Sequence, residues 1–161
     1  MREDEILERF LEVTEEMAGY ECDEIDFTQK RGNTPASIEL VFGAKYRRTW
    51  TRFYRLCTLN NCIVKIPNQD SIVFGGTSNR KTGKRVVEIL KNQVVSTTIF
   101  DNNTYSLTIE FVNGLILTFP NDEPSKASFK LSSNFVPHPR GGRGLIFTVL
   151  GKQLLLGGWM S

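Results

Sequence analysis

Apolar and polar residues alternate along residues 107–119, on both sides of an Asn-Gly pair. Alternation with a period of two is typical of β-strands, and an Asn-Gly pair between two such runs is a strong hairpin signal. A loop formed by residues 112–114 places Ile109 opposite Leu117 and gathers the apolar side chains on one face. A loop of two residues would instead place apolar side chains opposite polar ones. We therefore predict a three-residue loop in which Gly114 is left-handed.

Other short runs of alternating, β-branched and aromatic residues predict strands along most of the chain. Two further hairpins are predicted, one turning at Asn60-Asn61 and one at Gly151-Lys152, and residues 101–103 turn the chain into the central hairpin. The other predicted strands are residues 37–43, 53–59, 62–66, 71–76, 94–100, 129–131, 145–150 and 153–156.

A different spacing marks residues 3–18, where five apolar residues fall on one helical stripe: Ile6, Leu7, Phe10, Leu11 and Met17. This spacing is typical of an amphipathic α-helix, and acidic residues occupy much of the rest of its surface. Gly19 is well suited to end the helix. We expect the apolar stripe to pack into the core rather than into a groove of a partner.

Four segments carry weaker patterns. We interpret residues 20–36 as a connector, because Gly, Asn and Pro mark a turn within it. Residues 77–84 are polar and basic and predict a loop, while residues 85–91 fit either a short helix or a strand. Residues 120–143 are predicted to be mostly loop around one short strand.

These elements predict an α+β fold that is mainly antiparallel β, either a sandwich or a partly open barrel, with an N-terminal amphipathic helix. The length of 161 residues fits one domain, residues 1–161. Residues 37–43 and 108–114 share Ile, Glu, Val and Gly at equivalent positions. An internal duplication with halves 37–76 and 105–158 is therefore an open alternative to chance similarity between strands.

Charge is distributed unevenly, although the net charge is only +2. Residues 1–26 carry a net charge of −9, and residues 27–161 carry +11. Such asymmetry indicates either a charged partner or an acidic segment that lies against a basic body. The odd number of cysteines and the acidic N-terminal segment predict a cytoplasmic protein with reduced thiols and no membrane association.

Few residues indicate catalysis or metal binding. His138 is the only histidine, and Cys57 and Cys62 have no histidine with which to complete a metal site. Glu39 and Glu110 fall on the polar faces of their strands, so we expect them to point to solvent rather than to act as a catalytic pair. We therefore expect a protein that is not an enzyme and that uses no cofactor and no metal.

Residues 75–84 share only superficial features with a phosphate-binding loop. Six residues rather than four separate Gly76 from Gly83, and Arg85 stands where Ser or Thr would hold Mg²⁺. We interpret the segment as a solvated loop. The cations that could still meet an anion there are Arg80, Lys81 and Lys84.

Residues 45–55 combine cations with aromatic residues. Such a mixture is typical of protein-binding hot spots and of surfaces that bind nucleic acid. A third interpretation places the aromatic side chains in the core and the arginines on the outer face of a strand. The candidate partner-binding residues in this stretch are Lys45, Tyr46, Arg47, Arg48, Trp50, Arg52 and Arg55.

Residues 83–120 contain Gly-Lys-Arg-Val-Val and then Leu-Thr-Ile-Glu-Phe-Val-Asn-Gly-Leu-Ile-Leu, and a late strand ends in Leu-Leu-Leu-Gly-Gly-Trp. The chain resembles small bacterial β-rich domains of uncharacterised function in these stretches. They cover about half of the chain. Some of those domains look like immunity proteins that neutralise a cognate toxin. The resemblance implies a cytosolic, non-catalytic binding role and carries over no functional residue.

These features predict a binding protein of the inhibitor or immunity type, which covers the active site of a protein partner such as a toxin. The acidic helix supplies the candidate docking residues Glu8, Glu12 and Glu15, because an acidic face attracts a basic partner. The alternative is a nucleic-acid-binding domain that uses residues 45–55 and 140–143.

Overall fold

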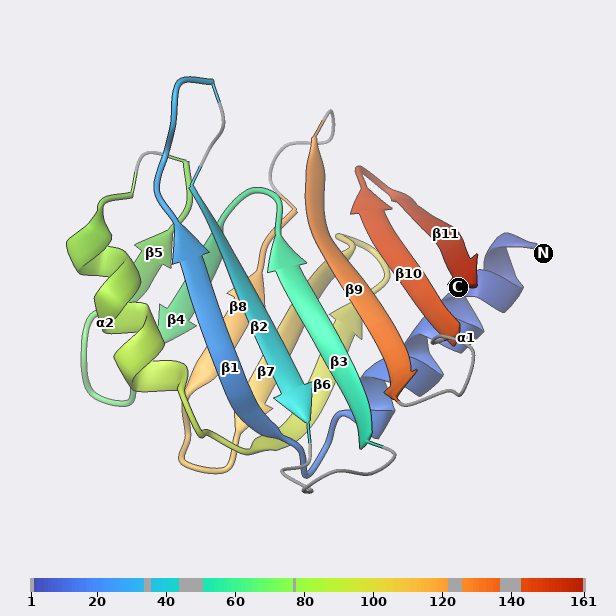
Figure 1. Ribbon diagram of the computed structural model, residues 1–161, viewed down its shortest axis with the longest axis horizontal. Helices are drawn as coiled ribbons and strands as arrows, with labels where there is room; N and C mark the ends of the chain where they lie inside the picture. The colour runs from blue at the N-terminus through green and yellow to red at the C-terminus, as the bar shows by residue number, and fades with distance from the viewer. Residues whose placement is uncertain are drawn as a thin grey trace.

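Two antiparallel sheets lie face to face, and one helix packs at each of two opposite sides of this pair (Figure 1). The structure is a computed structural model that describes residues 2–33, 36–43, 51–76, 78–121, 126–136 and 143–160. The helices are α1 (Glu3–Glu16) and α2 (Arg80–Leu90). The strands are β1 (Glu21–Thr28), β2 (Ser37–Gly43), β3 (Thr51–Thr58), β4 (Cys62–Lys65), β5 (Ile72–Phe74), β6 (Val95–Asp101), β7 (Ser106–Phe111), β8 (Ile116–Phe119), β9 (Ala127–Val136), β10 (Arg143–Leu150) and β11 (Gln153–Met160).

The six-stranded sheet has the strand order β1-β2-β3-β9-β10-β11, and the five-stranded sheet has the order β5-β4-β8-β7-β6. The predicted α+β class, the antiparallel sheets and the N-terminal helix are confirmed, and the sheets do not close into a barrel. Two isolated bridges connect the sheets: Glu21, the first residue of β1, pairs with Val94 before β6, and Ala36 before β2 pairs with Gly76 after β5. The unity of the chain as one domain and the duplication of residues 37–76 and 105–158 stay predictions.

The core lies between the two sheets, where alternate residues of most strands are buried. Removing this apolar surface from water is the main force that holds the two layers together. The largest fully buried side chains are Tyr54, Phe10, Phe42, Phe74, Phe119, Phe129 and Phe147.

The central hairpin, β7 and β8, has the predicted register. Ile109 pairs with Leu117, and the backbone N–H of Phe111 donates to the carbonyl oxygen of Leu115 at 2.9 Å. Residues 112–114 therefore form the loop, and Gly114 is left-handed with φ of 92°. The sequence predicted this loop because only a three-residue turn places every apolar side chain of the hairpin on the core face.

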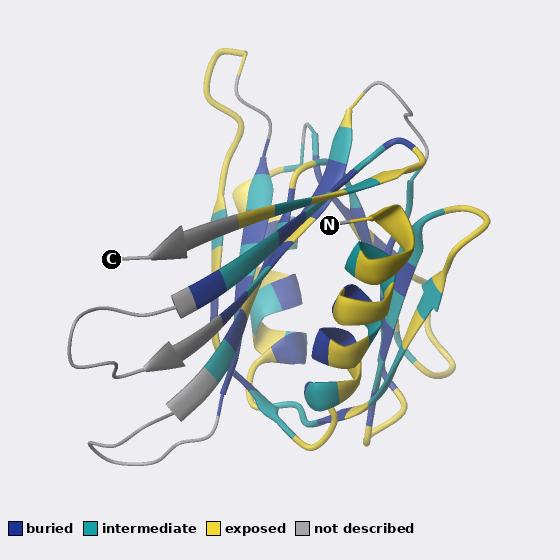
Figure 2. Cartoon of the chain, turned by 90° about the vertical axis from the view of Figure 1, so that its right-hand side faces the viewer, coloured by how far each residue is buried: buried dark blue, intermediate teal, exposed yellow. Residues whose placement is uncertain are grey.

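Helix α1 packs its apolar stripe into the core, as predicted. Its Phe10 is completely buried, with ring-centroid distances of 4.9 Å to Phe100 of β6, 5.3 Å to Phe147 of β10 and 6.3 Å to Phe129 of β9. One aromatic side chain of α1 thus contacts strands of both sheets. The other side of the helix faces solvent (Figure 2).

Helix α2 covers the opposite side and packs against β1 and β5. Its Gly83 lies directly over the ring of Phe27, since a Cβ atom at this position would come within 2.5 to 2.8 Å of three ring atoms. The predicted loop at residues 77–84 is therefore wrong from Arg80 onward, and residues 85–91 adopt the helical alternative through Leu90. The sequence pattern hid this helix because a glycine provides its first core contact.

Strand β1 replaces the connector predicted for residues 20–36, which is wrong for Glu21–Thr28. A register shift between Cys22 and Glu24 interrupts the pairing of β1 with β2. Such a bulge shifts the alternation by one residue, so that Cys22 and Ile25 are both buried although they are three positions apart. This shift, together with the acidic residues between them, concealed the strand.

The hairpin predicted around Asn60-Asn61 is wrong, although both of its strands exist. Strand β3 pairs with β2 and β9, whereas β4 pairs with β5 and β8, so the chain crosses from one sheet to the other at this turn. Close packing beside the crossing requires a glycine, since a Cβ atom at Gly75 would lie 2.6 Å from the carbonyl oxygen of Asn60. The sheet that each strand joins depends on packing in the whole core and not on the turn between the strands.

Strand β9 also runs further than the short strand predicted at residues 129–131, because both of its edges are paired, with β3 and with β10. The final hairpin is confirmed: β10 and β11 pair as predicted around Gly151, whose φ is 57°. This pairing adds two strands to the edge of the six-stranded sheet.

Candidate functional site

The acidic face is the outward side of α1, defined here by Glu8, Glu12 and Glu15. All three side chains are exposed, and Glu12 accepts a hydrogen bond from Nη1 of Arg9 at 2.8 Å. The predicted docking carboxylates are thus brought together on one rigid face. Glu16 differs from them, because it is half-buried and accepts a hydrogen bond from the hydroxyl of Tyr54 at 2.8 Å.

Helix stability does not explain why acidic residues occur at both ends of α1. The partial positive charge at a helix N-terminus favours acidic residues in the first turn, where Glu3, Asp4 and Glu5 stand. The opposite charge at the C-terminus disfavours acids, yet Glu15 and Glu16 occupy the last turn, which has no basic residue. An acid there costs about 0.3 to 1 kcal/mol relative to a cation.

A small pocket of about 230 Å³ lies at the start of α1. Two acids line it together with half-buried apolar and aromatic side chains of α1, the β6–β7 turn and β11. A partner could insert one side chain here, since protein interfaces combine charge with a few apolar anchors. The pocket is lined by Glu3, Asp4, Leu7, Tyr105, Lys152, Gln153 and Leu154.

The basic and aromatic stretch is only partly described. Residues 44–50 lie outside the described residues, and they include the candidates Lys45, Tyr46, Arg47, Arg48 and Trp50. Arg52 belongs to β3, and its side chain is likewise outside the described part.

The described end of this stretch agrees in part with each interpretation. Tyr54 is completely buried, as the core interpretation requires, whereas Arg55 is exposed on the outer face of the six-stranded sheet. Nε of Arg55 lies 2.7 Å from Oε1 of Glu39, and its guanidinium carbon lies 5.8 Å from the centroid of the Phe53 ring. Arg55 therefore already has an acidic and an aromatic partner within this chain.

Glu39 and Glu110 do not form a pair. Glu39 lies on β2 of one sheet and Glu110 on β7 of the other, and each alternates with buried neighbours. Both side chains are half-exposed, so the prediction that they point to solvent and not into a shared interior site is confirmed.

The basic face lies at the α2 side of the molecule and consists of six cations. They are Lys30 and Arg31, which follow β1, and Arg80, Lys81, Lys84 and Arg85 of α2. All six are exposed, and within the described part of the chain none of them forms an ion pair. Sequence reasoning noted three of these cations but missed the helix that arranges them.

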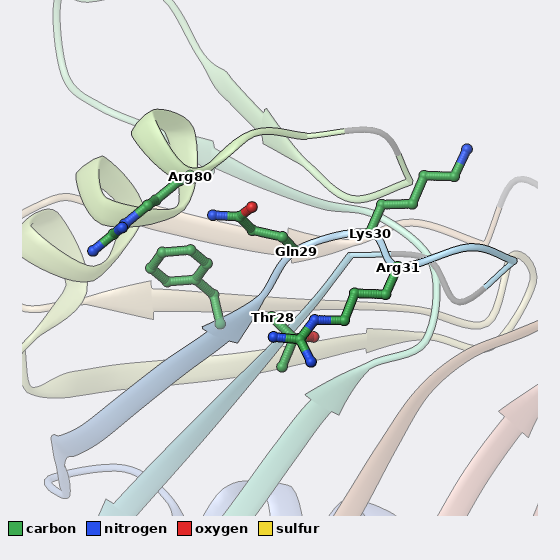
Figure 3. Close-up of a pocket in the computed structure, with 6 residues that line it drawn as sticks. Thr28, Gln29, Lys30, Arg31 and Arg80 are labelled. Atoms are coloured by element: carbon green, nitrogen blue, oxygen red, sulfur yellow. The ribbon is translucent and has the colours of Figure 1, made fainter.

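An open pocket of about 610 Å³ lies between the end of β1 and the start of α2. Figure 3 shows Arg80 and Gln29 on one side of it and Arg31 folded back along Thr28, while Lys30 points away from the other labelled side chains. Phe27 forms part of the wall. The pocket therefore offers cationic, amide, hydroxyl and aromatic groups together.

A second open pocket, of about 890 Å³, adjoins the first through Lys30. The turn where the chain crosses between the sheets lines it, as does the glycine turn after β5. Two exposed apolar side chains, Leu59 and Val73, contribute to its wall. Lys30 lines both pockets.

The cysteines are poor nucleophiles in this fold. Burial, with smaller contributions from Asp23 and Glu21, raises the pKa of Cys22 to about 12, and burial alone raises the pKa of Cys62 to about 12. Burial also raises the pKa of the half-buried Cys57, which lies on the other sheet from Cys62. These thiols stay protonated at neutral pH, and protonated thiols neither attack substrates nor bind metals well.

Two features are absent from the described residues. Within those residues no three His, Cys, Asp or Glu side chains are arranged to hold a metal ion. Neither helix found there has the length and apolar composition needed to cross a membrane.

Comparisons with protein-family models, with curated proteins and with solved structures gave no match to this chain.

Proposed function

We propose that this protein is a non-enzymatic binding domain that docks a basic protein partner through the acidic face of α1. One observation carries the proposal: Glu8, Glu12 and Glu15 are exposed together on a helix whose other side is fixed in the core by Phe10 and Met17. A charged surface that is already rigid loses little conformational entropy on binding. Its mode of action is occlusion, in which the acidic face covers the active site of a toxin-like partner.

The position of the basic face supports this proposal. The positive charge of residues 27–161 would repel a basic partner if it surrounded α1. Six of the eighteen cations in residues 27–161 form the basic face, however, at the opposite side of the two sheets (Figure 1). Charges further apart than about 8 Å are largely screened at physiological ionic strength. The acidic face can therefore attract a partner that the basic face does not contact.

The test is a capture experiment with charge-reversed protein. The triple variant Glu8→Lys, Glu12→Lys, Glu15→Lys and the wild type are immobilised and exposed to lysate of the source cells treated with nuclease. We expect the wild type to retain one stoichiometric basic protein that the variant loses, and the purified pair to associate more slowly as salt rises. Equal retention by the triple variant contradicts the proposal.

A matched control carries the same change in charge at another place. The variant Glu24→Lys, Asp26→Lys, Asp70→Lys also reverses three exposed carboxylates, two on β1 and one before β5. It should retain the partner, because these side chains lie outside the acidic face. Loss of binding in both variants would indicate a dependence on net charge and not on docking through α1.

A further inference from the structure

The six cations of the basic face and the pocket beside Phe27 lie together, and we propose that they bind single-stranded nucleic acid. Phosphate groups contact the cations of α2, and one base enters the pocket. This site is separate from the acidic face and does not depend on the protein partner. It also differs from the stretch at residues 45–55.

The cations of this face are available to an anion. Within the described residues they form no ion pair, and Arg80 and Lys81 stand in the first turn of α2, which contains no acid. The partial positive charge of a helix N-terminus disfavours cations at these positions. A bound phosphate relieves this repulsion.

The helix terminus itself is not the binding group. The side chain of Asn79 accepts a hydrogen bond from the backbone N–H of Thr82 at 3.0 Å and so caps α2. The attraction for phosphate therefore comes from the long cationic side chains. These side chains are exposed on α2 and on the segment after β1, and Figure 3 shows three of them, those of Arg80, Lys30 and Arg31.

The arrangement suits a polymer of phosphates better than one small anion. Arg80 and Lys84 are four residues apart, as are Lys81 and Arg85, which places each pair about 5 to 6 Å apart on one helix face. Lys30, beyond the start of the helix, lines both this pocket and the neighbouring one. A nucleic acid strand carries one charge per nucleotide and can contact several of these cations at once.

The pocket favours a single strand over a duplex. Its volume of about 610 Å³ lies within the range of small-ligand sites and accommodates one base. The ring of Phe27 is held beneath Gly83 and packs edge-on against Phe74 at 6.1 Å, so it forms a fixed wall. Gln29 supplies a hydrogen-bonding amide, while the hydroxyl of Thr28 already shares a hydrogen bond with that of Ser37 at 2.7 Å. Bases of a duplex are paired and stacked, and only an unpaired base is free to enter such a pocket.

The experiment measures fluorescence anisotropy of a labelled oligothymidylate and a labelled oligouridylate of about 12 nucleotides each. If about four phosphates are neutralised, the affinity should fall about 50-fold between about 50 and 200 mM salt. At least one of the two strands should bind in this way. Absence of binding of both at the lower salt concentration overturns the proposal.

Competitors distinguish this ligand from other anions. A duplex of equal length should compete more weakly than the single strand, because its bases cannot enter the pocket. An oligoglutamate of equal charge and inorganic tripolyphosphate should compete weakly as well. Equal competition by oligoglutamate would assign the face to an acidic protein partner, and equal competition by tripolyphosphate would assign it to small anions.

The contribution of the base is measured with an abasic strand of equal length. We expect it to bind at least about fivefold more weakly than oligothymidylate, because the contacts of the base with the pocket are lost. Its salt dependence should be unchanged, since the phosphates are the same. Equal affinity of the two strands contradicts the placement of a base in the pocket.

Two variants locate the binding face. Lys81→Gln with Lys84→Gln removes two cations from α2 and should weaken binding about 10-fold or more at low salt, with a shallower salt dependence. The control Lys65→Gln with Lys130→Gln removes two exposed cations elsewhere and should bind as the wild type does. Melting temperatures of both proteins verify that they are folded. Equal losses in the two variants contradict the assignment to α2.

Discussion

Helices α1 and α2 cover opposite sides of the same pair of sheets but contact them through different side chains. Helix α1 inserts the large ring of Phe10 between the sheets, whereas α2 approaches the ring of Phe27 through Gly83, which has no side chain. Their exposed faces carry opposite charge, acidic on α1 and basic on α2. Each also has charges in one terminal turn that its dipole disfavours. The core contacts therefore determine where each helix lies. The charged residues on its exposed face are not needed for that packing and are available for binding.

The largest expected effect comes from removing the ring that fixes α1. Phe10→Ala should lower the free energy of unfolding by about 3 to 5 kcal/mol, because it leaves a cavity where strands of both sheets meet. Urea unfolding monitored by circular dichroism measures this loss. The half-buried Leu7 on the same helix is the control, and Leu7→Ala should have a clearly smaller effect. Equal losses would show that Phe10 does not hold α1 in the way described.

A smaller loss is expected where α2 contacts β1. Gly83→Ala improves helix propensity by up to about 1 kcal/mol, but its methyl group would overlap the ring of Phe27. Overpacking of this kind costs about 1 to 3 kcal/mol, so the variant should be less stable than the wild type.

A double-mutant cycle with Phe27→Leu separates these two contributions. In that background Gly83→Ala should cost less, or should stabilise the protein, because the ring is absent. A cost of Gly83→Ala that does not change between the two backgrounds would exclude the proposed overlap.

The charges in the terminal turns predict a modest gain in stability. Lys81→Glu in the first turn of α2 and Glu15→Lys in the last turn of α1 should each raise the free energy of unfolding by about 0.3 to 1 kcal/mol at low salt. Each variant should also weaken the binding proposed for its face. Lys65→Glu and Glu24→Lys, outside both helices and both faces, control for the change in net charge in each direction. A loss of stability in both helix variants would refute the dipole argument.

The smallest expected effect on stability concerns the turn after β6. This turn begins directly after Phe100, whose ring contacts Phe10. The backbone N–H of Asn103, with help from Thr104, donates to Asp101 and lowers the pKa of that carboxyl. A lowered pKa in the folded state stabilises the protein above the unfolded pKa of about 3.9, and this contribution is lost as pH falls through the folded value.

The variant Asp101→Asn tests this dependence on pH. It should be slightly less stable than the wild type at neutral pH, and the difference should disappear in acid. Urea unfolding at pH 7 and in acid measures the difference. A difference that persists in acid would assign it to the geometry of the turn and not to the charge.

Local patterns predicted the elements whose burial follows a regular period. The central hairpin has the predicted register, and β2 has the predicted bounds. The final hairpin turns at Gly151 as predicted but its second strand runs on to Met160, and α1 ends at Glu16, two residues before the predicted end. Where burial does not follow a period, prediction was wrong. The bulge in β1 and the glycine contact of α2 both break the hydrophobic pattern. Each depends on a partner elsewhere in the chain, which is β2 for the bulge and Phe27 for Gly83.

The candidate sites also divide into one that local spacing predicted and one that it did not. Helical spacing was sufficient to predict that Glu8, Glu12 and Glu15 stand on the side of α1 away from the core, because the apolar stripe defines that side. No local pattern relates Lys30 and Arg31 to the cations of α2. Their proximity depends on the packing of α2 against the end of β1.

By itself, the sequence determined the α+β class, the acidic amphipathic helix, the central hairpin and the separation of charge along the chain. These features depend on contacts between residues close in sequence, for which the period of apolar residues is a direct physical signal. The tertiary structure alone decided that β3 and β4 belong to different sheets, that α2 exists and that the acidic and basic faces lie on opposite sides. The reason is that these features minimise the exposed apolar surface of the whole chain. They depend on contacts between residues that are far apart in the sequence.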